Sequence, residues 1–139
     1  MLLIDNSVWS RLLSGAVPRA HLNAVVEMLD AGEIATCLPF LLEAGYSAQS
    51  AADHEQSIDR LGALPSVSID ADIEATARKA QRELARAGHH RLSPIDLMIA
   101  ACAHEAGADV LHYDRDYDLI AELTSLRFES VWVAPAGSL

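Results

Sequence analysis

Short apolar runs alternate with longer segments of helical periodicity along the whole chain, and this alternation constrains the fold more than any other feature. The apolar runs predict strands at residues 2–4, 33–36, 66–69, 109–113 and 128–133. The segments between them repeat apolar residues every three or four positions, as amphipathic helices do. Strands that alternate with helices favour a mainly parallel central sheet with helices on both faces. We therefore expect an α/β fold with three layers, α/β/α.

The helices are predicted from the same periodicity and from their start and stop signals. The first carries Val8, Trp9, Leu12 and Leu13, and the second repeats Leu22, Val25, Val26 and Leu29 after Pro18. Further helices are expected from Pro39 to about Gln49 and over residues 53–63, 71–87, 93–107 and 116–123. The segment 71–87 is the clearest, because one face is apolar and Gly88 stands where a helix commonly stops.

The size and composition of the chain fit one domain. Its 139 residues, of which 51% are hydrophobic, can bury a real core, and no repeat or linker divides residues 1–139. No apolar run approaches the roughly 20 residues of a membrane span, and the start "MLLID" reaches an acid too early for a signal peptide. Cys37 and Cys102 have no second pair beside them, so we expect reduced thiols, a cytoplasmic protein and no membrane partner.

The charge balance limits the classes of binding partner that suit the chain. Twenty acids and ten bases leave a net charge of −10. Such a chain is poorly suited to non-specific binding of duplex DNA, where Lys and Arg neutralise the phosphates. The balance is compatible with an acidic metal site, with a basic protein partner, or simply with solubility.

Four acids lie where ligands bind in a parallel α/β sheet, beyond the carboxyl ends of the strands. Asp5 directly follows the first expected strand, and Asp114 follows the fourth. Glu43 stands in the first turns of the helix after the second strand, and Asp96 stands in the first turn of the helix opened by Pro94. Because these positions share one rim of the sheet, the four carboxylates could converge. A bound Mg²⁺ or Mn²⁺ would then relieve their mutual repulsion.

Each of these acids also has a structural interpretation, and the residues alone leave both open. The stretch "SPID" matches a capping box of the form S-x-x-D, with Asp96 at its last position. Asp5, Asp114 and Asp116 suit N-cap positions or the positive end of a helix dipole. Glu43 is harder to explain in this way, because it interrupts an apolar helix beyond the capping positions.

Four stretches of the sequence resemble the acidic motifs of PIN-domain ribonucleases, in the order of that family. They are "LLIDNSVWSRLL", "PFLLEAGYSA", "RLSPIDLMIAACA" and "VLHYDRDYDLIA", and together they span nearly the whole chain. The resemblance is strongest to the small VapC-type toxins of toxin–antitoxin pairs. It implies a metal-dependent endoribonuclease that hydrolyses RNA phosphodiester bonds and acts as the toxin of such a pair.

The resemblance also assigns roles to individual residues. It implies that Asp5, Glu43, Asp96 and Asp114 are the catalytic acids and hold one or two Mg²⁺ or Mn²⁺ ions. Ser7 matches a small hydroxyl residue two places after the first acid and is expected to support an acid or a metal-bound water. Asp116 matches a frequent additional acid in the last motif and is expected beside the ligands.

Two positions depart from the family pattern. Asn6 stands where Thr is common, and His112 stands where a Thr or Ser often precedes the last acid by two residues. The second departure leaves open which side chain orients Asp114. His112 is either a buried, hydrogen-bonded core residue or an imidazole that reaches the substrate.

The family pattern further implies partners. VapC-type proteins form homodimers and are inhibited by a cognate VapB-type antitoxin, a segment of which enters the acidic groove. The antitoxin, and not this chain, would contact operator DNA. An acidic protein suits a basic inhibitor segment. The alternative is a catalytically idle module that keeps the PIN fold for interaction only, and the presence of all four acids disfavours it.

A basic stripe on the helix over 71–87 has two interpretations. At about 100° per residue, Arg78, Arg82 and Arg86 fall along one line opposite the apolar face, with Lys79 beside it. The stripe is either a solvated surface or a track for the RNA backbone that leads toward the metal site.

Overall fold

The computed structural model describes residues 1–139 and contains one five-stranded sheet. The strands are β1 (Leu2–Ile4), β2 (Ile34–Cys37), β3 (Ser66–Val67), β4 (Asp109–His112) and β5 (Ser130–Trp132). They are arranged in the order β3-β2-β1-β4-β5, and all four pairings are parallel. The expected α/β fold with a mainly parallel central sheet is therefore confirmed. The carboxyl ends of β1 and β4, which are neighbours, lie at the same rim.

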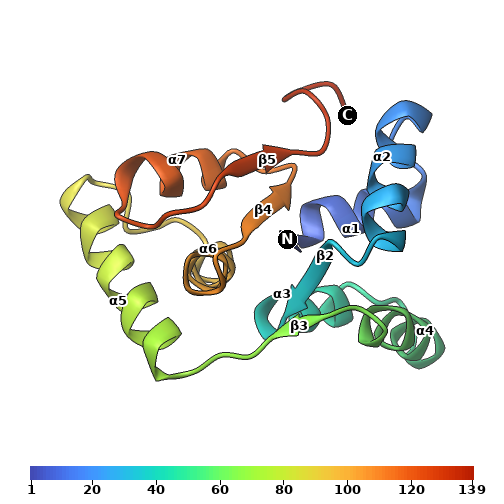
Figure 1. The fold of residues 1–139 in the computed structure, drawn as a ribbon, viewed down its shortest axis with the longest axis horizontal. Helices are drawn as coiled ribbons and strands as arrows, with labels where there is room; N and C mark the ends of the chain where they lie inside the picture. Colours follow the sequence, from blue (N-terminus) through green and yellow to red (C-terminus); the bar gives the residue numbers. More distant parts are fainter.

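Seven helices cover the two faces of the sheet. They are α1 (Asn6–Ser14), α2 (Arg19–Asp30), α3 (Leu38–Tyr46), α4 (Ala51–Gly62), α5 (Ala71–Arg86), α6 (Pro94–Ala106) and α7 (Asp116–Leu123). The chain moves outward from β1 to β3 and then crosses back to β4 and β5, and right-handed crossovers in opposite directions place helices on opposite faces. Figure 1 shows this arrangement, with α5, α6 and α7 on one side of the sheet and α1, α2 and α4 on the other.

The core consists of the central strands and the helices packed on them. All four residues of β2 are buried, as expected for a parallel strand covered on both faces. Helix α6 is buried almost all round, including Leu97, Ile99 and the run from Ala100 to Ala103. Its position between the sheet and its helical neighbours explains why the segment is so apolar. None of the helices is both long and apolar enough to cross a membrane.

Element boundaries differ from the expectation where tertiary pairing decides them. The second strand begins and ends one residue later than expected, so that α3 starts immediately after Cys37. Helix α3 stops at Tyr46 rather than near residue 49, and α4 starts at Ala51 because the Ser50 hydroxyl accepts a hydrogen bond from the Asp53 amide. The edge strands are shorter than their apolar runs because each has a neighbour on one side only.

The buried faces of the first two helices are also narrower than the apolar pattern suggested. Val8 and Val25 are buried, whereas Leu13 is 51% exposed and Val26 is 44% exposed. Both exposed residues belong to apolar repeats, but a helix that lies on a sheet buries only the positions that face it. The repeat therefore located the helices correctly and overstated how much of each is covered.

Candidate metal centre

Asp5 occupies the junction between β1 and α1, and both its carboxylate oxygens are held in place. It is the N-cap of α1, and its Oδ2 accepts a hydrogen bond from the Ser7 amide at 2.8 Å. Its Oδ1 accepts a hydrogen bond from the hydroxyl of Tyr117 at 2.8 Å. The side chain is almost completely buried, with 3% exposure. Asp5 can therefore cap α1 and at the same time be part of the candidate metal site.

Asp96 stands in the first turn of α6 and forms only half of a capping box. The hydroxyl of Ser93 accepts a hydrogen bond from the Asp96 amide at 3.4 Å, as the sequence predicted for the N-cap. The Asp96 carboxylate does not accept the hydrogen bond from the Ser93 amide that would complete the box. Its hydrogen-bond partner is the Tyr117 hydroxyl, 3.5 Å from Oδ1. The carboxylate thus turns away from its own helix end and toward Asp5.

Burial makes ionisation of Asp96 unfavourable. The residue is 5% exposed, and its pKa rises from 3.8 to about 8, mainly because the carboxyl is removed from water. The negative charges of Asp5, Asp114, Asp116 and Glu43 supply the rest of this rise, in that order of importance. Without a cation, this carboxyl keeps its proton at neutral pH. A cation at the site would reverse that preference.

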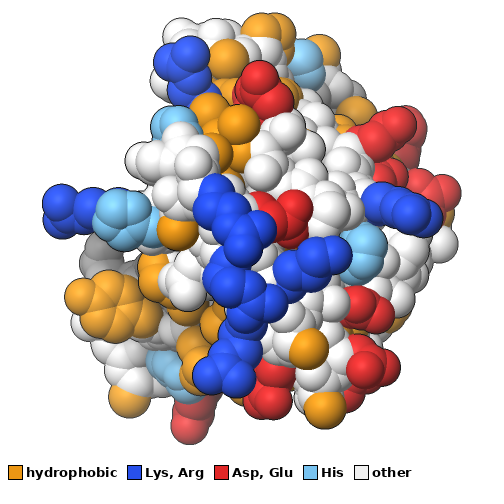
Figure 2. Space-filling view, turned by 90° about the vertical axis from the view of Figure 1, so that its left-hand side faces the viewer, with side chains coloured by type: hydrophobic (Ala, Val, Ile, Leu, Met, Phe, Trp, Pro, Cys, Tyr) orange, Lys and Arg blue, Asp and Glu red, His pale blue; other side chains and the backbone are white.

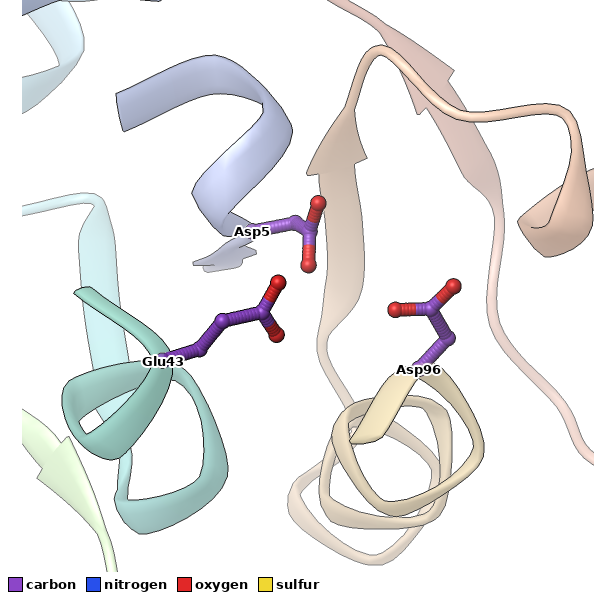
Figure 3. Close-up of side chains that lie close together, drawn as sticks. All are labelled: Asp5, Glu43 and Asp96. Atoms are coloured by element: carbon purple, nitrogen blue, oxygen red, sulfur yellow. The ribbon is translucent and has the colours of Figure 1, made fainter. Parts of the chain in front are cut away.

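Glu43 reaches the same place from α3. It lies beyond the first turn of that helix, is half-buried, and its carboxylate makes no hydrogen bond to the protein. Burial raises its pKa, and the charges of Asp5 and Asp114 add to the effect. Figure 3 shows the carboxylates of Asp5, Glu43 and Asp96 converging from three different elements. Glu43 is therefore the least constrained acid of the three.

The acids form two overlapping groups, and Asp96 belongs to both. Each residue of the first group, Asp5, Glu43 and Asp96, offers an oxygen within 4.8 Å of the others. The same limit holds for Asp96, Asp114 and Asp116. We call these five residues the acid cluster. All four acids singled out in the sequence thus lie in one cluster, together with Asp116.

A PIN-domain family model matches residues 2–123 of the chain. The chain belongs to the PIN-domain family. Ribonuclease VapC18 of Mycobacterium tuberculosis is 38% identical over 139 residues, which cover 98% of this chain and 97% of the relative. Ribonuclease VapC51 of the same organism is 36% identical over 137 residues, which cover 99% of this chain and 96% of the relative. The resemblance to VapC-type PIN domains is confirmed.

Solved structures show the same fold at lower sequence identity. DNA-bound VapBC from Salmonella typhimurium matches with a TM-score of 0.77 and 21% identity, over 96% of this chain and 100% of that chain. VapBC2 from Rickettsia felis, bound to a promoter DNA fragment, matches with a TM-score of 0.75 and 15% identity, over 94% of this chain and 98% of that chain. At these identities the likeness concerns the fold.

Tyr117 is the residue of this PIN domain that the sequence analysis missed. It is fully buried in α7, and its hydroxyl contacts the carboxylates of both Asp5 and Asp96. Burial and the neighbouring negative charges raise its pKa well above 10, so it remains a neutral donor. The signal was present in the sequence, because Tyr117 stands three residues after Asp114 and faces the core with Ile120.

Asp114 and Asp116 are positioned through the backbone. The Asp116 amide donates to Oδ1 of Asp114 at 2.9 Å, and the Asp114 amide donates to Nδ1 of His112 at 3.0 Å. The Nε2 of His112 lies 2.6 Å from the hydroxyl of Ser130, so the tautomer that accepts at Nδ1 donates at Nε2. His112 is fully buried, and burial lowers its pKa. It is a hydrogen-bonded core residue that orients the Asp114 backbone.

Ser7 and Asn6 have structural contacts beside the cluster. The Ser7 hydroxyl accepts a hydrogen bond from the Tyr113 amide at 2.9 Å, which ties the start of α1 to the segment after β4. Only the backbone amide of Ser7, and not its hydroxyl, contacts Asp5. The Asn6 side chain donates to the Ser47 hydroxyl at 3.2 Å and so links α1 to the end of α3.

The composition of the acid cluster suits a hard divalent cation. Every side-chain oxygen offered by the cluster belongs to a carboxylate, the ligand type that Mg²⁺ and Mn²⁺ prefer. No Lys or Arg forms an ion pair with any of the five acids, since no Lys or Arg nitrogen lies within 4.0 Å of a carboxylate oxygen. Buried carboxylates without a compensating charge are costly, and a cation removes this cost. The residues present therefore fit the expected metal.

The three arginines predicted to contact RNA do not enter the cluster. Arg78, Arg82 and Arg86 lie exposed on the outer surface of α5. The structure thus separates the acids, which face inward at the rim of the sheet, from the basic stripe, which faces solvent.

Proposed function

We propose that this PIN domain, comprising residues 1–139, is a metal-dependent endoribonuclease that acts as the toxin of a toxin–antitoxin module. The observation that carries the proposal is the acid cluster, in which carboxylates from four separate segments meet without any positive partner. The names of its relatives, which are VapC ribonucleases, support RNA as the substrate. The reaction is hydrolysis of a phosphodiester bond.

Asp5, Asp96, Asp114 and Glu43 are the proposed ligands of one or two Mg²⁺ or Mn²⁺ ions. When bound, such an ion supplies an activated water and relieves charge on the phosphoryl oxygens. Asp96 belongs to both acid groups and would be a ligand of an ion held by either of them. Its raised pKa means that the residue must lose its proton for ligation, so metal affinity should increase with pH up to about 8.

The remaining side chains hold these ligands in place. Tyr117 donates a hydrogen bond to Asp5 and lies within reach of Asp96, which fixes the separation of the two carboxylates. His112 positions the backbone of Asp114. Glu43 has no such restraint, and we assign it to orienting the attacking water or to ligating an ion directly. Rigid ligands and one adaptable acid suit a site in which a water must be deprotonated.

The proposed partners follow from the same site. We propose a VapB-type antitoxin whose basic segment enters the acidic groove and blocks it, and the net charge of −10 suits such a segment. The solved relatives are VapBC assemblies, some of them bound to DNA, which is consistent with operator contacts made through the antitoxin. We also propose a homodimer. RNA and antitoxin are cytoplasmic molecules, so the proposal places the protein in the cytoplasm.

The test is cleavage of mixed cellular RNA by the purified, antitoxin-free protein, with mapping of the new ends. We expect cleavage with Mn²⁺ or Mg²⁺ and none with a chelator. Asp96→Asn should lower the rate by about a hundredfold or more, because an uncharged amide is a poor ligand for a hard cation. Asp59→Asn, an exposed acid on α4, is the matched control and should cleave like the wild type.

Two results would contradict the proposal. Cleavage of equal rate in Asp96→Asn and the wild type would remove the cluster from the reaction. A folded wild-type protein that binds a VapB-type antitoxin but cuts no RNA with either metal would favour the idle interaction module instead.

A further inference from the structure

The exposed face of α5 carries a row of cations that the metal centre does not use. Arg78, Lys79, Arg82 and Arg86 are all exposed, and we call them the basic ridge. Figure 2 shows Lys and Arg side chains gathered into a continuous band on the face of the molecule that contains α5. They account for four of the ten bases in a chain of net charge −10. Their concentration on one helix is therefore unlike the rest of the surface.

Helix geometry aligns the ridge opposite the core. At about 100° per residue the four cations fall within an arc of roughly 100°. The buried residues Ile73, Ala80 and Leu84 lie on the other side of the helix. Arg78, Arg82 and Arg86 follow one another about 6 Å apart along the axis. A regular spacing of this kind suits a partner that repeats a negative charge along its length.

No carboxylate neutralises the ridge. No Lys or Arg nitrogen lies within 4.0 Å of a carboxylate oxygen. Like charges four residues apart destabilise a helix by about 0.2–0.5 kcal/mol per pair, and the ridge contains two such pairs. A purely structural helix would gain from alternating acids and bases at these positions. The ridge contributes nothing to the packing of α5 that would explain its charge.

A polar cavity of about 380 Å³ adjoins the ridge and shares Lys79 with it. Its lining also includes Arg127, from the segment between α7 and β5, and His104, from the last turn of α6. The His104 Nδ1 accepts a hydrogen bond from the Arg127 amide at 2.8 Å, which leaves Nε2 as the donor of the neutral ring. The cavity thus brings Arg127 to the same surface as Lys79, while Glu105 and Glu83 contact its lining at Thr76 and Ser125.

We propose that the basic ridge and the adjoining cavity bind the sugar–phosphate backbone of the single-stranded RNA substrate. This inference rests on the proposed ribonuclease function and adds the surface that holds the RNA outside the metal centre. The ridge ends at Arg86, and the chain then leads into α6, whose first turn carries Asp96. Evenly spaced, flexible cations without aromatic neighbours recognise phosphates rather than bases, so the contact is independent of sequence.

The test compares charge-matched variants in one RNA-binding assay. All proteins carry Asp96→Asn and are free of metal, so that a fluorescein-labelled, mixed-sequence single-stranded RNA is bound but not cut. Arg82→Gln/Arg86→Gln should weaken binding roughly 20-fold at ~0.1 M salt and reduce the slope of log K against log salt by about 1.4. Arg82→Lys/Arg86→Lys keeps both charges and should retain the slope.

The control is Arg19→Gln/Arg60→Gln, which removes two exposed charges from α2 and α4. It should bind RNA like its parent, because the global charge change is the same and the ridge is intact. Equal losses in the control and ridge variants would reduce the effect to net charge and overturn the proposal. Unchanged affinity in the ridge variant would also overturn it, and a concurrent loss of self-association would identify the ridge as an interface between copies.

A kinetic experiment distinguishes failure of the ridge proposal from failure of the proposed ribonuclease function. In the metal-loaded protein without the Asp96 substitution, the ridge variant should raise KM for RNA and leave kcat within about twofold. If the wild type cuts RNA and the ridge variant has an unchanged KM, only the ridge proposal fails. If the wild type cuts no RNA, the proposed function fails whatever the ridge binds. Melting curves of every variant verify that each is folded.

Discussion

The acid cluster and the basic ridge are both regions where charges of one sign crowd together without partners, yet they differ in burial. Asp5 and Asp96 are 3% and 5% exposed, whereas every residue of the ridge is exposed. Water and salt screen the ridge, so its repulsion is small. The acids of the cluster are buried or half-buried, and burial, followed by their mutual repulsion, raises the pKa values of Asp96, Glu43 and Asp116.

This difference indicates how each region can work. A buried set of acids stores enough unfavourable energy to bind a small, doubly charged ion tightly at one point. An exposed row of cations stores little and can bind a long polyanion weakly at many points, with strong dependence on salt. The same crowding of charge therefore suits a metal in one region and a nucleic-acid backbone in the other.

The largest expected effect is the pH dependence that Asp96 gives the metal-free protein. Its pKa rises from 3.8 to about 8 on folding, so between these values the unfolded chain releases a proton that the folded protein retains. Stability should therefore fall as pH rises from about 4 and level off above about 8, by a contribution of the order of 5 kcal/mol.

Urea unfolding across this pH range in the presence of a chelator measures the effect. Asp96→Asn should flatten the curve, whereas the exposed control Asp59→Asn should preserve it. If both variants kept the wild-type slope, the charge on Asp96 would not be penalised by burial, and the contrast with the ridge would disappear.

The second effect is stabilisation by metal. Mg²⁺ or Mn²⁺ at a hundred times its dissociation constant should stabilise the wild type by about 2.7 kcal/mol. Glu43→Gln removes one charge with little change of shape and sacrifices no cap, so without metal it should melt at or above the wild-type temperature. The same variant should gain less from metal.

Differential scanning fluorimetry measures the melting temperatures of the wild type and Glu43→Gln with and without metal. The exposed Glu55→Gln is the control. A clear loss of metal-free stability in Glu43→Gln, combined with no response of the wild type to metal, would mean that the acids are structural.

The third effect concerns the Tyr117 hydroxyl, a neutral hydrogen-bond donor inside the acid cluster. The basic ridge contains no equivalent group. Tyr117→Phe removes the hydroxyl that Asp5 accepts from, and a hydrogen bond to a charged group contributes about 1.5–3 kcal/mol. Tyr113→Phe is the matched control, because its hydroxyl contacts the Leu139 amide and no acid. Chemical denaturation should show the larger loss for Tyr117→Phe, and equal losses would contradict the assigned role.

The smallest effect tests the ridge itself. Arg82→Gln removes both like-charge pairs of the ridge, with Arg78 and with Arg86, and should increase the free energy of unfolding by about 0.5 kcal/mol at low salt. Arg60→Gln, in the last turn of α4, has no basic residue four positions away and should not gain. A gain in Arg82→Gln that persisted at ~1 M salt would not be electrostatic, because screening at that salt is nearly complete.

The sequence predicted the convergence of the acids better than it predicted the details around them. Parallel strands place their carboxyl ends at one rim, so Asp5 and Asp114 could be expected near Glu43 and Asp96, which stand in the first turns of helices at that rim. The family motifs then implied a metal-binding role for all four acids. Those motifs did not indicate Tyr117, because a tyrosine in an apolar helix face is an ordinary core residue until its hydroxyl is seen to contact two acids. Ser7 was assigned to the cluster by pattern, yet its hydroxyl contacts the Tyr113 backbone instead.

By itself, the sequence determined the α/β alternation, the family, the positions of the acids and the charge of the ridge, since periodicity, motif and charge are local properties of the chain. Only the tertiary structure decided that Asp96 forms half a capping box, that His112 orients the Asp114 backbone, and where the edge strands end. These features depend on contacts between residues far apart in the chain. Burial also depends on such contacts. It makes like charges in the acid cluster strongly unfavourable, whereas water screens the like charges of the exposed ridge.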